Sequence, residues 1–153
     1  MLQLVVPTLN EKPLLDAMAQ LYSYDFSEIT HRAIGQDGLF PEISCFSAMW
    51  TDPSRYPHVI MVDQEPAGFA IVQRTGDQAF DMEQFFVLRK FRRSGIGTRA
   101  AQDLFSTFPG QWTVGQIAAN TAAQAFWRGV ISGYTKGDFQ DTAAGDPVQS
   151  FQS

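Results

Sequence analysis

Cysteine and histidine are scarce in this sequence: its 153 residues include one cysteine, Cys45, and two histidines, His31 and His58. A single cysteine cannot form a disulfide within the chain, and no cysteine or histidine has a partner at the spacing of a zinc site. We therefore expect no metal site, a reduced cytoplasmic setting, structural or surface roles for both histidines, and a buried apolar role for Cys45.

Long apolar runs are also missing. No segment approaches the ~20 apolar residues that a membrane-spanning helix needs. The first residues, Met-Leu-Gln-Leu-Val-Val-Pro, lack both the basic region and the long apolar region of a signal peptide. We expect a protein that is not associated with a membrane.

Basic residues are fewer than acidic ones, with 11 Lys and Arg against 16 Asp and Glu, for a net charge of −5. This balance argues against general nucleic-acid binding. Five of the cations nevertheless lie between Arg89 and Arg99. Charge alone fits two interpretations equally, a local anion site and a solvated basic helix end.

The composition and the patterning predict one α/β domain over residues 1–153. Apolar residues make up 44% of the chain and aromatic residues 13%, which suffices for a globular core. The expected strands are residues 2–6, 58–62, 67–74, 79–88 and 111–118, and residues 63–66 form a hairpin turn between two of them. The expected helices are residues 10–21, with Asn10 as cap, 42–50, 97–108 and 120–130, with Asn120 as cap. One or two short strands follow Gly133.

The segment Arg92-Arg93-Ser94-Gly95-Ile96-Gly97 joins an expected strand to an expected helix. Glycines allow close backbone approach, the helix N-terminus attracts anions, and arginines bind phosphate oxygens. Together these features favour a phosphate or pyrophosphate site. The alternative is that Gly95 and Gly97 only shape a tight turn.

Two familiar phosphate-binding motifs do not fit this segment. The dinucleotide pattern G-x-G-x-x-A is present, but six residues separate the strand from Gly95, and the next strand does not end in an acidic residue. A Walker loop is excluded because Thr98 and Arg99 follow Gly97.

The segment resembles motif A of the GCN5-related N-acetyltransferases (GNAT), whose pattern is Gln/Arg-x-x-Gly-x-Gly/Ala. The matching residues are Phe86-Val87-Leu88 followed by Arg92, Gly95 and Gly97. A second family segment resembles Asn120-x-x-Ala123-x-x-Phe126-Trp127 with the closing pair Gly133-Tyr134. The likeness covers about residues 59–134.

This resemblance implies a mixed, mostly antiparallel central sheet with two splayed parallel strands, residues 81–88 and 112–118, and about four flanking helices. It also implies acetyl-coenzyme A between those strands as the acetyl donor. The implied cofactor-binding residues are Phe85, Phe86 and Val87 through their backbone, Arg92, Arg93, Ser94, Gly95, Ile96, Gly97 and Thr98 around the pyrophosphate, and Asn120 near the pantetheine end. Core packing explains Phe85 and Phe86 equally well.

The implied reaction is direct transfer of the acetyl group from the thioester to a primary amine of a small-molecule or peptide acceptor. Glu83 occupies a position where some family members carry the base, and Asp81 projects from the same face of its strand. The alternative interpretation is that each of these two carboxylates is only a solvated residue of the strand, with no catalytic role. Trp127 stands where the family usually has a tyrosine that protonates the departing thiolate. Tyr134 is the candidate that could replace this acid, and the alternative is that Tyr134 has only a packing role.

The acceptor is expected on the N-terminal helices, where the candidates are Tyr22, Tyr24, Asp25, Phe26 and Glu28. A core-covering cluster explains these aromatic rings equally well. A homodimer is compatible with the resemblance, and no nucleic acid is expected. The alternative function is a non-catalytic acetyl-coenzyme A sensor or interaction module.

Overall fold

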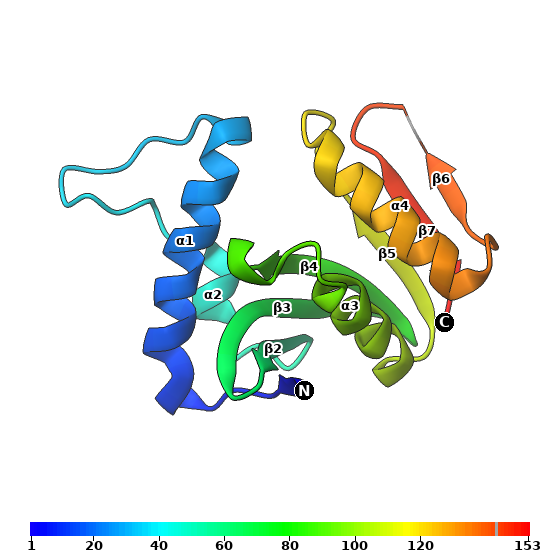
Figure 1. The fold of residues 1–153 in the computed structure, drawn as a ribbon, viewed down its shortest axis with the longest axis horizontal. Coiled ribbons are helices and arrows are strands. Elements are labelled where there is room, and N and C mark those ends of the chain that lie inside the picture. The colour runs from blue at the N-terminus through cyan, green and yellow to red at the C-terminus, as the bar shows by residue number, and fades with distance from the viewer. Residues whose placement is uncertain (143) are drawn as a thin grey trace.

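The chain forms one seven-stranded mixed sheet with helices on both faces (Figure 1). The computed structural model describes residues 1–142 and 144–153. The sheet order is β1-β2-β3-β4-β5-β7-β6, and every neighbouring pair is antiparallel except β4 and β5. The strands are β1 (Leu2–Val5), β2 (Arg55–Val62), β3 (Glu65–Gly76), β4 (Ala79–Val87), β5 (Gln111–Gly115), β6 (Gln140–Thr142) and β7 (Val148–Gln152). The expected mixed, mostly antiparallel sheet is confirmed.

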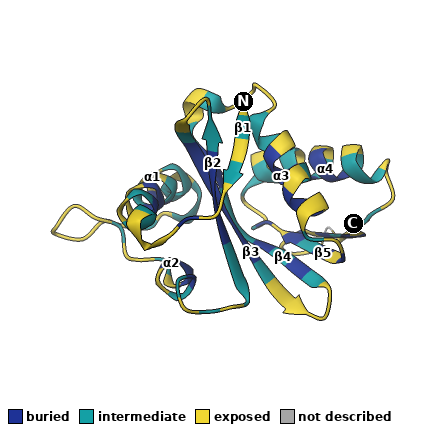
Figure 2. Cartoon of the chain, turned by 90° about the horizontal axis from the view of Figure 1, so that it is seen from below, coloured by how far each residue is buried: buried dark blue, intermediate teal, exposed yellow. Residues whose placement is uncertain are grey.

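Four α-helices flank the sheet within the described residues: α1 (Lys12–Thr30), α2 (Ser44–Ala48), α3 (Ile96–Thr107) and α4 (Thr121–Thr135). Two short 3₁₀ turns, η1 (Leu9–Glu11) and η2 (Arg89–Phe91), precede α1 and α3. Figure 2 shows α1 and α2 on one face of the sheet and α3 and α4 on the other. None of the helices described is long and apolar enough to cross a membrane.

The two sheet faces bury separate apolar clusters because strand side chains alternate between faces. Phe69 and Ile71 of β3 pack towards α1 and α2, beside Leu15 and Phe46. The intervening Ala70 and Val72 pack towards α3 and α4, in a cluster that also contains Trp112 with no exposed surface. The long buried strand β3 thus belongs to both halves of the core.

The start of α1 differs from the prediction. The N-cap of α1 is Glu11 and not Asn10, and it makes no side-chain cap bond. The capping box lies at the preceding turn, where Thr8 caps η1 and each side chain of the Thr8–Glu11 pair bonds the other residue's backbone. Asn10 lies inside η1. The helix also runs past Leu21 to Thr30, because Tyr22 continues its buried stripe against Phe69 and Phe86.

The parallel pair β4–β5 is short. Its register covers only Ala79–Asp81 against Gln111–Thr113, after which the strands diverge (Figure 1). The strand β5 ends at Gly115, three residues before the predicted end at Ala118, because its partner β7 begins only at Val148, opposite Gly115. The next amide, Gln116 N–H, donates to the Pro147 carbonyl, which precedes β7. The predicted splay of two parallel strands is therefore present.

Gly68 is required by a close backbone approach between β3 and β4. An added Cβ there would overlap the carbonyl oxygen of Phe86, and both residues are buried. By contrast, a Cβ added at the exposed Gly129 of α4 meets no described atom within 4 Å.

We predict opposite effects for the same substitution at these two glycines. Gly68→Ala should lower the free energy of unfolding by about 2 kcal/mol or more, because backbone atoms must move apart. Gly129→Ala should raise it by roughly 0.5–1 kcal/mol, since alanine favours helix over glycine. Urea denaturation of both variants measures the difference, and a neutral Gly68→Ala would contradict the close approach.

Candidate active site

A cleft of about 1020 Å³ opens where β4 and β5 diverge. Its walls come from five parts of the chain: the C-terminal half of α1, the end of β4 with the loop that follows, the first turn of α3, the start of α4, and the residues after β5 with the loop before β7. The parallel pairing that ends at Asp81 thus creates a space between two strands of one sheet.

The N-terminus of α3 faces this cleft. Gly95 caps the helix with a φ of 81°, and Arg93 also has a positive φ of 60°. The first helical bond runs from Arg99 N–H to the Gly95 carbonyl, so the preceding N–H groups lack an intrahelical acceptor. Gly95, Gly97 and Thr98 line the cleft, which gives an anion a helix N-terminus to bind.

Gly97 also has a packing role. A Cβ at this position would lie 3.2 Å from Cζ of Phe126 and 3.6 Å from Cγ2 of Val87. The missing side chain therefore lets α3 pack closely against both α4 and β4. The turn interpretation and the anion-site interpretation of this glycine are both compatible with the structure.

Arg92 is held by protein groups. Its Nε donates to the Val87 carbonyl at 2.8 Å, and its guanidinium donates to Asp25 Oδ2 at 2.6 Å. Arg89 binds the other oxygen of Asp25, at 2.7 Å. Partial burial favours a higher pKa for the Asp25 carboxyl, but the hydrogen bonds from Arg92 and Arg89 hold that pKa below its usual value. Asp25 thereby ties α1 to the loop before α3.

Most of the predicted cofactor residues gather in the cleft. Those that line it are Phe85, Phe86, Val87, Arg92, Arg93, Gly95, Gly97, Thr98 and Asn120. Ser94 and Ile96 do not: the Ser94 hydroxyl donates to the Phe91 carbonyl, and Ile96 packs against an apolar cluster. Asn120 caps α4 as predicted, since its side-chain oxygen accepts from Ala123 N–H at 3.1 Å.

Glu83 lies on the cleft wall at an irregularity of β4. Ile71 and Val72 of β3 pair with Gln84 and Met82, which leaves Glu83 as the extra residue of a bulge. The Arg55 guanidinium of β2 donates three hydrogen bonds to its carboxylate, at 2.9–3.2 Å, and also contacts Asp52. Arg55 was not among the predicted site residues.

Asp81 lies two residues earlier and does not line the cleft. Burial, and then the nearby negative charge of Glu83, raise the pKa of Asp81 to about 6. The carboxyl pair therefore combines one ion-paired group at the cleft with one neighbour that exchanges a proton near neutral pH.

The two residues considered as acids lie in different places. Trp127 is 6% exposed and lines the cleft floor, with its ring against Phe85 and Phe126. Tyr134 lies near the other end of α4, where its hydroxyl contacts Ser106 and Ser153, and it does not line the cleft. The structure therefore does not bring Tyr134 to Glu83.

The expected acceptor residues divide in a similar way. Tyr22, Asp25, Phe26 and Glu28 line the cleft from α1, whereas Tyr24 is 70% exposed and points elsewhere. Burial raises the pKa of Tyr22 to about 12, so this hydroxyl stays protonated. The wall on the α1 side thus combines aromatic rings with carboxylates.

Sequence reasoning missed Gln116 and Asp146, which also line the cleft. Gln116 is 8% exposed and follows the buried Trp112 and Val114 in alternation. The sequence signal for Gln116 is that a polar residue occupies a position where the alternation of the strand predicts a core residue. Asp146 precedes β7, and its carboxylate accepts from Ala118 N–H at 2.7 Å.

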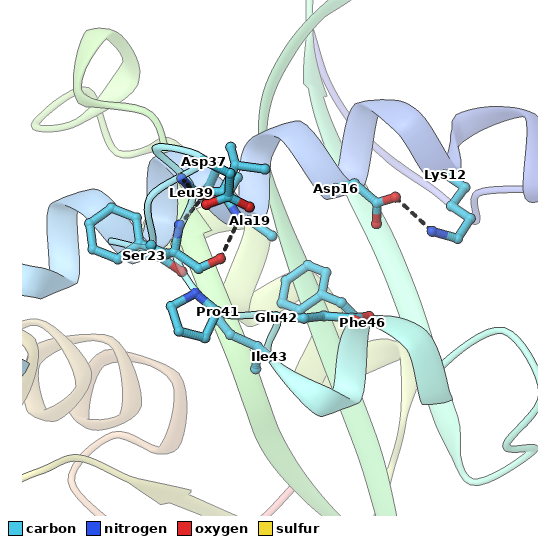
Figure 3. Close-up of a pocket in the computed structure, with 13 residues that line it drawn as sticks. Lys12, Asp16, Ala19, Ser23, Asp37, Leu39, Pro41, Glu42, Ile43 and Phe46 are labelled. Carbon is cyan, nitrogen blue, oxygen red and sulfur yellow. Dashed lines mark hydrogen bonds and ion pairs between the residues drawn. The ribbon is translucent and has the colours of Figure 1, made fainter. Parts of the chain in front are cut away.

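A second, smaller cavity of 490 Å³ lies between α1, α2 and the segment that joins them (Figure 3). Gln20 lines this cavity and exchanges two hydrogen bonds with the backbone of Phe40. Lys12 pairs with Asp16 along α1. No predicted cofactor-binding or catalytic residue lines it.

The remaining candidates have structural surroundings. Burial lowers the pKa of His58, which contacts the Tyr56 carbonyl and the Phe108 ring. Cys45 is buried, as predicted, and desolvation raises the pKa of its thiol to about 11. In the described part of the chain, no three potential ligand residues come together as a metal site.

Solved structures share this fold along nearly the whole chain. An acetyltransferase from Thermus thermophilus is 14% identical, with a TM-score of 0.76 over 100% of this chain and 97% of its own. A GNAT-family acetyltransferase from Staphylococcus aureus is 13% identical, with a TM-score of 0.68 over 99% of both chains. The PaiA N-acetyltransferase from Thermoplasma acidophilum, in complex with coenzyme A, is 10% identical, with a TM-score of 0.64 over 100% of this chain and 99% of its own.

Sequence comparison gives the family directly. No curated protein matches the chain at a significant level. The model of the "Acetyltransferase (GNAT) family" matches residues 15–130, which include the end of β4, the loop before α3 and the start of α4. The chain belongs to the GNAT family of acetyltransferases.

Proposed function

We propose that the protein transfers the acetyl group of acetyl-coenzyme A directly to a primary amine in the cleft between β4 and β5. Acetyl-coenzyme A as the acetyl donor follows from the family assignment. The observation that carries the proposal is that one cleft contains both the N-terminus of α3 and the edge of β4 that β5 leaves without a partner strand after Asp81. The first suits a pyrophosphate, and the second offers backbone groups to an amide-containing arm.

The proposed cosubstrate orientation follows from these two features. The pyrophosphate binds the backbone N–H groups between Arg93 and Thr98, and the pantetheine arm runs along Phe85, Phe86 and Val87. Arg93, at a positive φ and exposed, supplies a cation beside the phosphates. Arg92 acts by holding the Val87 carbonyl and Asp25, and so positions the loop.

The amine enters from the α1 side of the cleft, where Tyr22, Phe26 and Glu28 lie. This wall suits a small-molecule or peptide amine with an apolar body and a cationic head. The amine must lose a proton before its nitrogen attacks the thioester carbonyl carbon. The proton passes to Glu83, or through water to the Asp81–Glu83 pair. The nitrogen–carbon bond forms, the carbon–sulfur bond then breaks and the thiolate of coenzyme A leaves, and the nitrogen gives up its second proton to water.

Trp127 cannot protonate that thiolate, and Tyr134 lies outside the cleft. In the proposed reaction, water therefore carries the second proton of the attacking nitrogen to the thiolate. A non-catalytic acetyl-coenzyme A sensor is the second candidate, and Trp127 on the cleft floor is the observation that favours it. An acetyltransferase releases the free thiol of coenzyme A when its amine acceptor is present, whereas a sensor releases none with any amine.

Adding a negative charge at the α3 N-terminus should weaken binding of coenzyme A. Thr98→Glu is expected to raise the Kd at least about tenfold, because its carboxylate repels the phosphates at short range. The same carboxylate favours the first turn of a helix, so thermal stability should not fall. Isothermal titration measures the Kd, and Thr107→Glu in the last turn of α3 is the matched control. Equal affinities in the two folded variants would refute the phosphate site.

Removing the charge of Glu83 should slow turnover. Glu83→Gln is expected to lower kcat by about 10²–10⁴-fold, which is the usual contribution of general base catalysis, with little change in coenzyme A affinity. A thiol-release assay against polyamines, amino acids, aminoglycosides and peptide N-termini identifies the acceptor and then compares the variants. Wild-type kcat in Glu83→Gln would exclude this residue as the base. Coenzyme A binding without thiol release for any amine would favour the sensor.

Neutralising Asp81 should stabilise the protein at pH 7 but not at pH 4. The pKa of Asp81 in the folded protein, about 6, lies above its ordinary value of 3.8, so the folded state binds more protons between these values. The contribution of Asp81 to wild-type stability therefore falls as pH rises from about 4 to 6. Asp81→Asn removes this loss and should gain about 1–2 kcal/mol at pH 7, after discounting for solvent access. Denaturation at both pH values measures the gain.

The exposed Asp77, in the turn before β4, provides the control. Asp77→Asn should show no pH-dependent gain. An equal gain for Asp81→Asn at pH 4 and pH 7 would mean that the raised pKa of Asp81 is not its cause.

A further inference from the structure

The smaller cavity, of about 490 Å³, borders a different stripe of α1 from the one that lines the cleft. Lys12, Asp16, Ala19 and Ser23 line this cavity, and their spacing of three and four residues places them along one side of the helix. Tyr22 belongs to the separate stripe that lines the cleft. The volume lies within the range of about 300–1,000 Å³ that small-ligand sites occupy. The cavity is therefore a second candidate binding site, distinct from the proposed cosubstrate site.

The most buried polar residue of this cavity is Ser23, which is 3% exposed. Ser27, one turn later, satisfies its hydroxyl on the Tyr24 carbonyl of its own helix, whereas the Ser23 hydroxyl has no hydrogen-bond partner among residues 1–142 and 144–153. In that part of the chain, the fully enclosed side-chain atoms without a partner are Trp50 Nε1 and Gln116 Oε1, so Ser23 Oγ keeps some accessible surface. Because buried hydroxyls normally have partners, a group inside the cavity is the missing partner of Ser23.

Carboxylates outnumber cations around the cavity. Its charged lining residues are Asp16, Asp37, Glu42 and Lys12. Lys12 pairs with Asp16 at 2.6 Å, so no cation of the lining is left to compensate the other two carboxylates. Arg32 donates to the Pro41 carbonyl at 3.1 Å but does not line the cavity. The excess of negative charge favours a cation over an anion as the ligand.

The inner wall of the cavity is apolar, and its outer wall is held in place. Ala19 and Phe46 are both buried and line it from α1 and α2 (Figure 3). The opposite wall is the segment that joins these helices, and Gln20 ties this segment to α1 through two hydrogen bonds with Phe40, at 2.8 and 3.0 Å. The cavity is therefore formed before a ligand arrives, and it offers an apolar surface beside its polar groups.

We propose that this cavity binds a small organic ammonium compound. The Ser23 hydroxyl oxygen accepts a hydrogen bond from the ammonium group, the carboxylates of Asp37 and Glu42 stabilise its charge, and the apolar part of the compound packs against Phe46. A neutral apolar compound leaves the Ser23 hydroxyl unpaired, and an anion is repelled by the carboxylates. The inference goes beyond the proposed function and does not depend on it, because no residue with a role in that function lines the cavity.

Two compounds of similar shape test whether the cavity selects a cation. Phenethylamine is positively charged at neutral pH, and phenethyl alcohol is neutral. Nuclear magnetic resonance titration of the isotope-labelled protein follows both sites at once, because the amide of Gly35 reports on the cavity and those of Gly95, Gly97 and Gly115 report on the cleft. The amine should shift the Gly35 signal saturably, with a Kd at least about fivefold below that of the alcohol. This shift should persist when coenzyme A is present in excess.

Two substitutions test the polar groups of the cavity. Ser23→Ala and Glu42→Gln should each raise the Kd of phenethylamine, measured at Gly35, about two- to tenfold. Ser23→Ala favours the helix, and Glu42 is exposed, so both variants should fold. The matched controls are Ser27→Ala, which removes a hydroxyl of α1 that lines neither the cavity nor the cleft, and Asp138→Asn, which removes an exposed charge after α4. Both controls should bind the amine like the wild type.

Equal affinities for the amine and the alcohol overturn the inference, because the cavity then selects only an apolar body. The inference is also wrong if the amine leaves the Gly35 signal unchanged, if it shifts only the glycine signals of the cleft, or if the two variants bind it like their controls. A failure of the proposed function gives a different result. In that case coenzyme A leaves the signals of Gly95 and Gly97 unchanged, whatever the amine does at Gly35.

Discussion

The early end of the β4–β5 pairing is the constraint on which the rest of the structure depends. The strand β4 pairs along most of its length with β3, whereas its parallel partner β5 stays with it for only three residues while pairing with β7 throughout. The backbone of β4 beyond Asp81 therefore has one occupied edge and one edge facing the cleft. Backbone N–H and C=O groups need partners, so this edge is suited to a ligand that carries amides.

The cleft is also balanced in charge. Arginines before α3 favour an anion, but without compensation they would repel each other in the free protein. Asp25 of α1 lies between Arg89 and Arg92 and bonds both. The charges are reversed at Glu83 on the other wall, where one cation, Arg55, binds two carboxylates, those of Glu83 and Asp52. These ion pairs connect β2 to the middle of β4 and α1 to the loop that follows β4, so the two walls are positioned by elements distant in sequence.

Local sequence signals predicted the parts of the site that local chemistry determines. The loop of residues 92–97 owes its position to glycines and to the following helix, and Asn120 caps α4 through its own side chain. The long-range parts could not be predicted from local sequence. The partner of Glu83 is Arg55, 28 residues away, and the bulge that exposes Glu83 depends on the register with β3. Tyr134 was considered for chemistry from sequence similarity, yet its place near the end of α4 puts it outside the cleft.

The chemistry of the cleft floor differs from that of its walls. The floor holds Phe85, Trp127 and the neutral Gln116, whereas the charged groups lie at the α3 end and at Glu83. In the proposed complex, this neutral, largely apolar floor would exclude water from the middle of the cosubstrate, while the charges at the two ends of the cleft would meet the phosphates and the ammonium. In such surroundings a hydrogen bond is stronger than in water, and an unpaired polar atom is more costly.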